Sequence, residues 1–195
     1  MTLISETKSA QTDAPILDVL AARWSPRAYT AEPIDESKLA SALEAARWSP
    51  SAGNSQPWRF IVARRGSAAF EKVSAALMGF NQAWAPAASV LLVGLYTELR
   101  DSEGKLRATP SYDLGQAMAH LSIQAHHDGL HVHQMTGFDP EALAASFELP
   151  ADVKPFVVAA IGTVGAPDDL DEVLAERERQ PRTRLSRTEI VLVDE

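Results

Sequence analysis

Apolar residues recur with the period of an α-helix over residues 34–48. Asp35 stands in the position of a helix cap, Ile34 precedes it as half of a hydrophobic staple, and Pro50 follows the end of the pattern. The apolar positions of this segment are Leu39, Ala42, Leu43 and Ala46. The spacing therefore predicts an amphipathic helix that stops before Pro50.

A second long helix is predicted over residues 113–127. Asp113 and Gln116 have the spacing of a capping box, and Gly129 follows as a terminator. One face carries Leu114, Met118, Leu121 and Ala125. We expect this helix to lie in the core of the protein.

The remaining periodic segments are shorter. Helices are expected at 15–23, 67–78, 140–147 and 169–178, each beginning near Pro, Ser or Asp. Runs of strand length and composition occur at 60–63, 89–96, 156–164 and 189–193. The second and third of these runs are apolar on both alternating faces, so they are expected to be central strands covered by helices on each side. The pattern predicts an α/β or α+β fold.

Composition narrows the class of protein. The chain has 195 residues, 46% of them hydrophobic, with no repeat and no low-complexity linker, so we expect one domain over 1–195 with residues 1–13 as a mobile tail. The 18 basic and 26 acidic residues give a net charge of −8, which disfavours a nucleic acid as partner. The polar amino terminus and the lack of a long apolar run favour a cytoplasmic protein without a membrane span.

Several classes of active site are excluded because the residues that they require are absent from the sequence. The chain has no cysteine, which excludes disulfides, thiolate metal sites and thiol nucleophiles, and it contains no G-x-S-x-G, H-E-x-x-H, Walker or G-x-G-x-x-G motif. Five histidines cluster at 120, 126, 127, 131 and 133 and raise the question of a metal site. Gly129 separates them, and carboxylate or thiolate co-ligands are missing, so we expect no metal and assign them to a helix end and the start of an exposed strand.

Three separated polar segments could serve a phosphorylated, flat ligand. In "RWSPR", Arg23, Ser25 and Arg27 alternate and would point the same way if the segment is extended. In "RWSPSAGNSQPWRF", residues 47–60, a glycine allows close backbone approach and amide side chains suit the edge of a heterocycle. In "QPRTRLSRTEI" two arginines alternate before the last apolar run. Each arginine pair alone also fits a solvated surface, but together they indicate an anionic ligand.

These segments resemble the FMN-dependent nitroreductase family, in the order of that family and over about residues 14–191. "RWSPR" resembles its R-x-S-x-R segment, and "PSAGNSQPWRF" is similar to its P-S-x-x-N-x-Q-P-W signature. "DLGQAMAHLSIQAHHDGL" resembles its core helix, "HQMTGFD" its loop beside the flavin, and "RTRLSRTEIV" its closing basic pair and strand. The resemblance implies a mixed central sheet flanked by helices and a homodimer with two FMN sites at the interface, in which the carboxy-terminal strand crosses to the partner.

The resemblance also implies residue roles. Arg23, Ser25, Arg182 and Arg184 would hold the FMN phosphate, with Arg27 nearer the ribityl chain or flavin N1 and O2. The residues that would line the isoalloxazine are Ser51, Asn54 and Gln56. The backbone N–H groups of Thr136 and Gly137 would face flavin N5 and O4, so no catalytic side chain is expected. Thr136 stands where the family often has an acidic residue.

The function that the resemblance implies is transfer of hydride from NADH or NADPH through FMN to a flat, electron-poor acceptor by a ping-pong mechanism. Nitroaromatics, quinones and conjugated carbonyls are the expected acceptors. The alternatives are a specialised flavin reductase of a small aldehyde, a dehalogenase-like enzyme, or a flavin-binding protein without turnover. Residues 97–112 are expected to form a lid, and Phe80, Trp84 and Tyr112 are open to assignment as substrate contacts or as packing residues.

Overall fold

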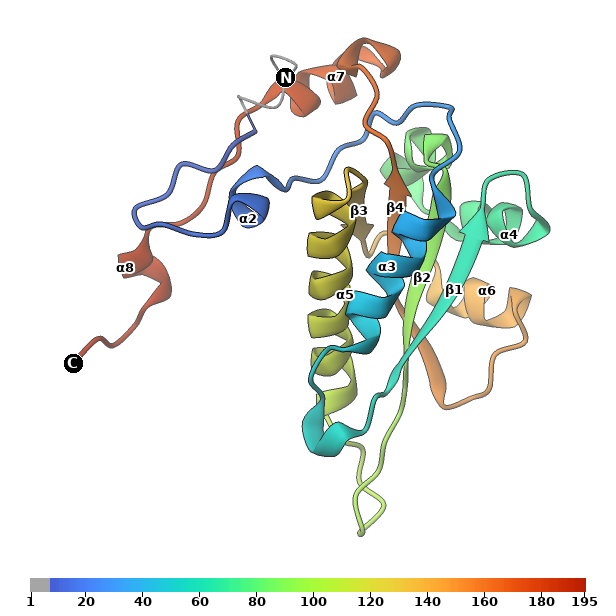
Figure 1. Ribbon diagram of the computed structural model, residues 1–195. Helices are drawn as coiled ribbons and strands as arrows, with labels where there is room; N and C mark the ends of the chain where they lie inside the picture. Colours follow the sequence, from blue (N-terminus) through green and yellow to red (C-terminus); the bar gives the residue numbers. More distant parts are fainter. Residues whose placement is uncertain (1–7) are drawn as a thin grey trace.

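A computed structural model describes residues 8–195 of the chain (Figure 1). Residues 1–7, which belong to the segment predicted to be a mobile tail, lie outside the described residues. Within the rest of that segment, Lys8 is buried and its amine donates to the carbonyl of Gln180, and the N–H of Ala10 donates to Ala21 O at 2.9 Å. None of the helices in residues 8–195 combines the length and hydrophobicity needed to span a lipid bilayer.

The described chain forms a four-stranded sheet in the order β1-β2-β4-β3. The strands are β1 (Trp58–Arg64), β2 (Val90–Thr97), β3 (His131–Met135) and β4 (Val153–Gly162). The two doubly apolar runs are the two central strands, β2 and β4, as predicted. All three pairings are antiparallel, so the parallel pairing of a mixed sheet would require a strand beyond these four.

Seven α-helices and four short 3₁₀ turns are described. The helices are α2 (Asp18–Ala22), α3 (Glu36–Arg47), α4 (Ala68–Ala76), α5 (Thr109–His127), α6 (Pro140–Ser146), α7 (Glu172–Arg179) and α8 (Arg187–Ile190). The 3₁₀ turns are η1 (Ala52–Asn54), η2 (Gly79–Ala83), η3 (Ala85–Ala87) and η4 (Pro167–Asp169). All six helices that the sequence predicted are present, which confirms an α/β fold with a sheet flanked by helices.

The helices cover the two faces of the sheet as separate layers (Figure 1). On one face, α3 and α5 bury Leu39, Met118 and Leu121 against β2 and β4. On the other face, α4 and α6 bury Phe70 and Leu143 in a second cluster. The sheet is therefore covered on both sides, as the apolar composition of its central strands requires.

The two long helices begin differently from one another. Asp35 caps α3 as predicted and accepts the N–H of Ser37 at 2.8 Å. In contrast, α5 begins at Thr109, four residues before the predicted cap, because Pro110 suits the first turn of a helix. Asp113 consequently lies inside the helix, where it is buried and accepts the N–H of Ala52 at 3.2 Å.

The two ends of the described chain run side by side, away from the sheet (Figure 1). The guanidinium of Arg182 ties them by donating to Ala21 O at 2.6 Å and Lys8 O at 3.0 Å. The strand predicted over 189–193 is not formed. Glu189 instead closes a capping box with Ser186 and forms the short helix α8, and the apolar residues that follow have no sheet edge of their own chain beside them.

Gly94 in β2 lies where α5 packs closely on the sheet. A Cβ added there would lie 2.8 Å from Val157 Cγ1 and 3.1 Å from Met118 Sδ. We therefore expect Gly94→Ala to lower the free energy of unfolding by about 1 to 3 kcal/mol, measured by urea denaturation. Gly115→Ala is the control, because a Cβ at Gly115 in α5 meets nothing within 4 Å. An equal loss of stability in both variants would contradict the packing argument.

Candidate functional site

Three arginines from the two ends of the chain gather beside α2. The pKa of Arg23 is lowered by burial and then by the positive charge of Arg184. The pKa of Arg182 is lowered by burial and then by Arg23 and Arg184. None of the salt bridges in residues 8–195 involves these three side chains. We call them the arginine cluster, and their uncompensated charge is suited to an anion.

The arginine cluster borders a cavity of about 360 Å³ between α2, α5 and β3. Its lining residues are Leu20, Arg23, Ser25, Ala119, Ser122, Ile123, Val132 and Gln134. Gln134 is fixed there, because its amide donates to Ser122 Oγ at 2.9 Å and to Met118 O at 3.1 Å. Two predicted ligands, Arg23 and Ser25, thus share one cavity.

A cleft of about 420 Å³ adjoins this cavity, since Gln134 lines both. The cleft is lined by Leu114, Gly115, Met118, His133, Gln134, Met135, Thr136, Phe156 and Val157. At its end Thr136 and Gly137 are exposed, and no hydrogen bond from either backbone N–H is found in the part of the chain that the structure describes. A mainly apolar cleft with free donors at one end is suited to a flat ligand that carries an acceptor on its edge.

Asn81 supports this end of the cleft, and the sequence interpretation missed it. Its amide donates to Gly137 O at 3.0 Å, and the N–H of Met78 donates to the same oxygen at 3.1 Å. A Cβ on Gly137 would lie 2.6 Å from Asn81 Nδ2, so the contact requires glycine. The amide pair "NQ" at 81–82 was an available signal, of the same kind as that used for the turn at 51–56.

Arg27 lies apart from the arginine cluster. Its guanidinium carbon is 5.7 Å from the centroid of Phe80 and 5.9 Å from that of Trp84, and Nη1 is 3.9 Å from Glu178 Oε2. The backbone N–H of Arg27 donates to Glu178 Oε1 at 2.7 Å. The expected alternation of Arg23, Ser25 and Arg27 toward one side is therefore not observed, because the contacts with Glu178 draw Arg27 elsewhere.

The predicted amide turn adopts an unusual backbone. Gly53, Asn54 and Gln56 all have positive φ, at 59°, 53° and 47°. Ser51 Oγ accepts the N–H of Gln56 at 3.0 Å, and Gln56 Nε2 donates to Asn54 O at 3.2 Å. Glycine and asparagine tolerate the left-handed region, whereas a longer side chain such as Gln56 is held there at some cost. The turn is a defined structure with exposed amide groups.

The turn and the arginine cluster lie at different levels of α5. Asp113 holds the turn through Ala52, whereas the cavity beside the cluster is lined by Ser122. Nine residues of α-helix separate these two positions, which corresponds to about 14 Å along the axis. One chain therefore does not bring Ser51, Asn54 and Gln56 to the cavity that Arg23 and Ser25 line.

The histidines at the end of α5 and in β3 are packing groups. The rings of His126 and His131 are 5.0 Å apart edge to face, and His133 lies 4.4 Å from Trp84. Burial lowers the pKa of His131 and of His133 to about 4, so both are neutral at pH 7. Nδ1 of the neutral His133 donates to Pro26 O at 2.8 Å, because a carbonyl can only accept. Within residues 8–195 no three His, Asp or Glu side chains group as metal ligands.

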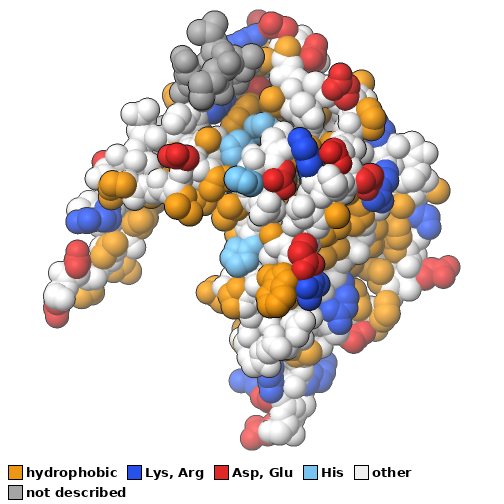
Figure 2. Space-filling model, viewed as in Figure 1, with side chains coloured by type: hydrophobic (Ala, Val, Ile, Leu, Met, Phe, Trp, Pro, Cys, Tyr) orange, Lys and Arg blue, Asp and Glu red, His pale blue; other side chains and the backbone are white. Residues whose placement is uncertain are grey.

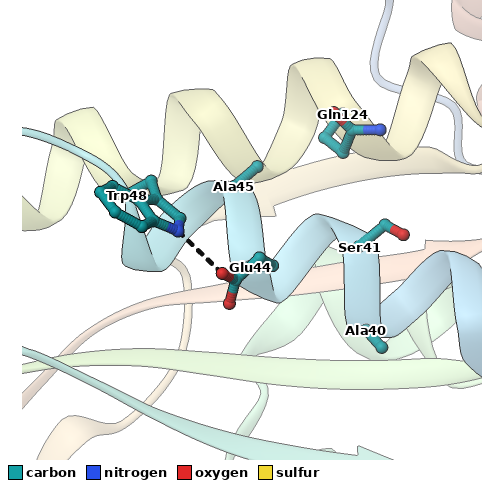
Figure 3. Close-up of a pocket in the computed structure, with 6 residues that line it drawn as sticks. All are labelled: Ala40, Ser41, Glu44, Ala45, Trp48 and Gln124. Carbon is teal, nitrogen blue, oxygen red and sulfur yellow. Dashed lines mark hydrogen bonds between the residues drawn. The ribbon is translucent and has the colours of Figure 1, made fainter.

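A further groove lies between α3 and α5 (Figure 3). Its lining is Ala40, Ser41, Glu44, Ala45, Trp48 and Gln124. The indole of Trp48 donates to Glu44 Oε1 at 2.8 Å, and Arg47 pairs with the same carboxylate. None of the predicted site residues lines this groove, and its only carboxylate is already paired. The candidate site is therefore the cavity and cleft along α5 and β3.

Comparisons with known proteins agree with the fold. The model of the nitroreductase family matches residues 20–88. The chain is 41% identical over 135 residues to an "Uncharacterized 15.4 kDa protein in ask 5'region" of Mycolicibacterium smegmatis, which covers 66% of this chain and 90% of that protein. It is 30% identical over 183 residues to an "NADH dehydrogenase" of Thermus thermophilus, which covers 76% of this chain and 87% of that protein.

A crystal structure of an oxidoreductase containing FMN is 36% identical to this chain, with a TM-score of 0.86 over 93% of this chain and 92% of the other. The matched residues 20–88 include both "RWSPR" and the turn at 51–56. Similarity of sequence and structure thus extends over nearly the whole chain, which belongs to the nitroreductase family.

Proposed function

We propose that this protein is an FMN-dependent oxidoreductase that takes hydride from NADH or NADPH and passes electrons to a flat, electron-poor acceptor. The arginine cluster carries the proposal, because three guanidinium groups without a salt bridge in residues 8–195 lie beside a cavity that adjoins an apolar cleft with backbone donors at its far end. The similarity to an FMN-containing oxidoreductase and to an NADH dehydrogenase supports it. Nitroaromatics, quinones and conjugated carbonyls are the acceptors that fit.

The residues present fit an FMN phosphate. Arg23, Arg182 and Arg184 supply positive charge that no salt bridge within residues 8–195 neutralises, and Ser25 adds a hydroxyl to the cavity that Arg23 lines. Charge-assisted hydrogen bonds of this kind contribute about 1.5 to 3 kcal/mol each. The cluster would therefore anchor the cofactor through its phosphate, and riboflavin would lose most of that attraction.

The residues present also fit the flavin ring. When bound, FMN supplies the hydride chemistry, and the protein binds and orients it. The N–H groups of Thr136 and Gly137 are free to donate to acceptors on the ring edge and to stabilise negative charge there. Arg27 Nε is buried without a hydrogen-bond partner in residues 8–195, while the side chain as a whole is 24% exposed, so we assign the accessible part of this guanidinium to the ring or ribityl chain. Because the donors at 136–137 are backbone groups, an acidic side chain is not needed at Thr136.

A second copy of the chain would complete the site. The turn with Ser51, Asn54 and Gln56 lies about 14 Å along α5 from the cavity, so a twofold-related chain would have to bring it to the partner's cofactor. Figure 2 shows the molecule hollowed between its terminal segments and its body, with hydrophobic side chains along the hollow. Ile190, Leu192 and Val193 are 65%, 92% and 72% exposed in one chain. These observations support a homodimer in which the carboxy-terminal segment crosses to the partner.

The alternative functions depend on the segment between β2 and α5. It is an irregular loop with one isolated bridge between Arg100 and Leu106, and Tyr112 beyond it is 69% exposed. Trp84 is buried, stacks on Tyr29 and contacts His133, so it is a packing residue rather than a substrate contact. A specialised aldehyde reductase or dehalogenase-like enzyme would differ in this loop, whereas a flavin-binding protein without turnover would show no acceptor-dependent oxidation of nicotinamide.

The phosphate assignment is tested with Arg184→Ala. We expect FMN affinity to fall about tenfold or more, since the lost contact is worth roughly 1.5 to 3 kcal/mol. Titration of apoprotein, followed by flavin fluorescence, measures the affinity for FMN and for riboflavin, and only FMN should weaken. Arg64→Ala is the matched control, because Arg64 pairs with Glu36 on the surface. Unchanged FMN affinity in both Arg184→Ala and Arg23→Ala would contradict the assignment.

The assembly is tested by deleting residues 188–195. This change removes the exposed apolar residues but leaves the arginine cluster intact, so a loss of flavin would come from the loss of the interface. We expect size-exclusion chromatography to show a monomer that elutes without flavin absorbance. A truncated protein that stays dimeric and yellow would rule out the crossing segment.

The reaction is tested by separating its two substrates. Because hydride would enter and leave at the same flavin atom, nicotinamide and acceptor are expected to occupy the cleft in turn. Anaerobic protein should bleach with NADH or NADPH and recover its absorbance when a nitroaromatic or quinone is added after the nicotinamide is removed. Initial rates with both substrates varied should give parallel double-reciprocal lines. Intersecting lines would show a ternary complex and refute the shared cleft.

A further inference from the structure

Glu178 in α7 is one of the most enclosed carboxylates of the described chain, with 1% of its surface exposed. Its Oε1 accepts the backbone N–H of Arg27 at 2.7 Å and that of Ala28 at 3.1 Å. These are charge-assisted bonds that join a helix near the carboxy terminus to the segment that follows Arg23 and Ser25. Neither the proposed chemistry nor the phosphate site uses this side chain directly.

Two further hydrogen bonds hold the segment from Pro26 to Ala28. His133 Nδ1 donates to Pro26 O at 2.8 Å, and the N–H of Gly165 donates to Ala28 O at 2.9 Å. These contacts fix the backbone from Pro26 to Ala28 relative to β3, to α7 and to the segment that follows β4. The position of the Arg27 side chain is consequently set by its neighbours before any ligand binds.

Charge is distributed unevenly along the proposed site. Glu178 Oε2 lies 3.9 Å from Arg27 Nη1, whereas Arg23, Arg182 and Arg184 have no carboxylate within 4 Å in the described chain. Burial lowers the pKa of Arg27, and the charge of Glu178 is the main opposing influence. Glu178 therefore offsets part of the charge of Arg27 and also opposes the lowering of the pKa of Lys8 by burial, whereas among residues 8–195 it forms no salt bridge with the three arginines of the cluster.

Glu178 offsets the charge of Arg27 only in part. Arg27 Nε and Glu178 Oε2 are both buried, and neither has a hydrogen-bond partner in residues 8–195. The 3.9 Å separation is too long for a hydrogen bond, so the pair interacts through space. The guanidinium is held between Phe80 and Trp84 on one side and Glu178 on the other, with a donor still available.

We propose that Glu178 is a positioning residue of the flavin site, which fixes Arg27 and sets the positive charge that Arg27 presents to the flavin ring. The inference rests on the proposed function, since it concerns bound FMN. Reduced flavin carries more negative charge than oxidised flavin, so a positive group beside the ring favours the reduced form. By offsetting Arg27, Glu178 holds the reduction potential of the flavin below the value that Arg27 alone would give.

Glu178→Gln isolates the charge. The amide oxygen of glutamine still accepts the N–H groups of Arg27 and Ala28, and the size of the side chain is nearly unchanged. We expect the reduced flavin to gain about tenfold in affinity over the oxidised flavin, which for a two-electron couple is about 30 mV toward a more positive potential. Equilibration of holoprotein with redox dyes of known potential measures the shift. Glu176→Gln, the same change at an exposed position of α7, is the matched control and should leave the potential unchanged.

A double-variant cycle separates an effect through Arg27 from a general one. Because Glu178 acts through Arg27, Glu178→Gln should shift the potential clearly less in an Arg27→Gln background than in the wild-type background. Glu178→Asp keeps the charge on a shorter side chain and should lie between wild type and Glu178→Gln. If the glutamine variant does not fold, judged by circular dichroism, the aspartate variant against wild type becomes the measurement, and a positive shift is expected.

The inference fails if Glu178→Gln or, in its place, Glu178→Asp retains the wild-type potential. It also fails if Glu178→Gln gives the same shift in both backgrounds. These outcomes differ from failure of the proposed function, which would appear as wild-type protein that binds no FMN.

Discussion

The contact between α5 and the two central strands positions the turn, the cleft and the cavity of the candidate site. Leu114, Met118 and Leu121 are fully buried against β2 and β4, and Gly94 permits the helix to approach this closely. The buried face of α5 therefore fixes the relative positions of the residues that this helix contacts. From that helix, Asp113 holds the turn at 51–56, Leu114 and Met118 line the cleft, and Ser122 lines the cavity beside the arginines.

A second constraint is electrostatic and joins the two ends of the chain. Bringing like charges together is unfavourable, yet the charge of Arg184 helps to lower the pKa of Arg23, and the charges of Arg23 and Arg184 help to lower that of Arg182. The contacts that hold them are made largely by backbone carbonyls, as where Arg182 binds Ala21 O and Lys8 O. The molecule thus sustains a concentration of positive charge in a chain whose net charge is −8. An anion would relieve that repulsion.

The fold could be predicted from the sequence wherever local pattern and burial agree. The spacing of apolar residues located α3 and α5, and double-sided apolar runs identified β2 and β4 as central strands. Prediction was weaker where a distant partner decides the outcome. Asp113 has the spacing of a helix cap, but Pro110 lies in the first turn of α5, which begins four residues earlier. Asp113 therefore lies inside the helix, where its buried carboxylate accepts the N–H of Ala52. The run at 189–193 is strand-like in composition, yet a strand forms only against a sheet edge.

The structure brings some of the predicted site residues together and separates others, while their roles stay predictions. Arg23 and Ser25 do share a cavity, and the amide turn is a defined structure. The departure of Arg27 depends on Glu178, which lies 151 residues later in the chain, and no local pattern could indicate it. Asn81 could have been noticed from the amide pair at 81–82, but its contact with Gly137, 56 residues later, depends on the tertiary fold.

The left-handed residues of the turn at 51–56 have a thermodynamic consequence. Asn54 and Gln56 hold a conformation that costs a non-glycine residue on the order of 1 to 3 kcal/mol, and Ser51, Asp113 and the backbone maintain it in the free chain. The ordering entropy of these residues is therefore lost when the protein folds and not when a ligand arrives. A ligand that meets the turn would encounter a rigid, preformed surface, and its binding free energy would carry little penalty for shaping the loop.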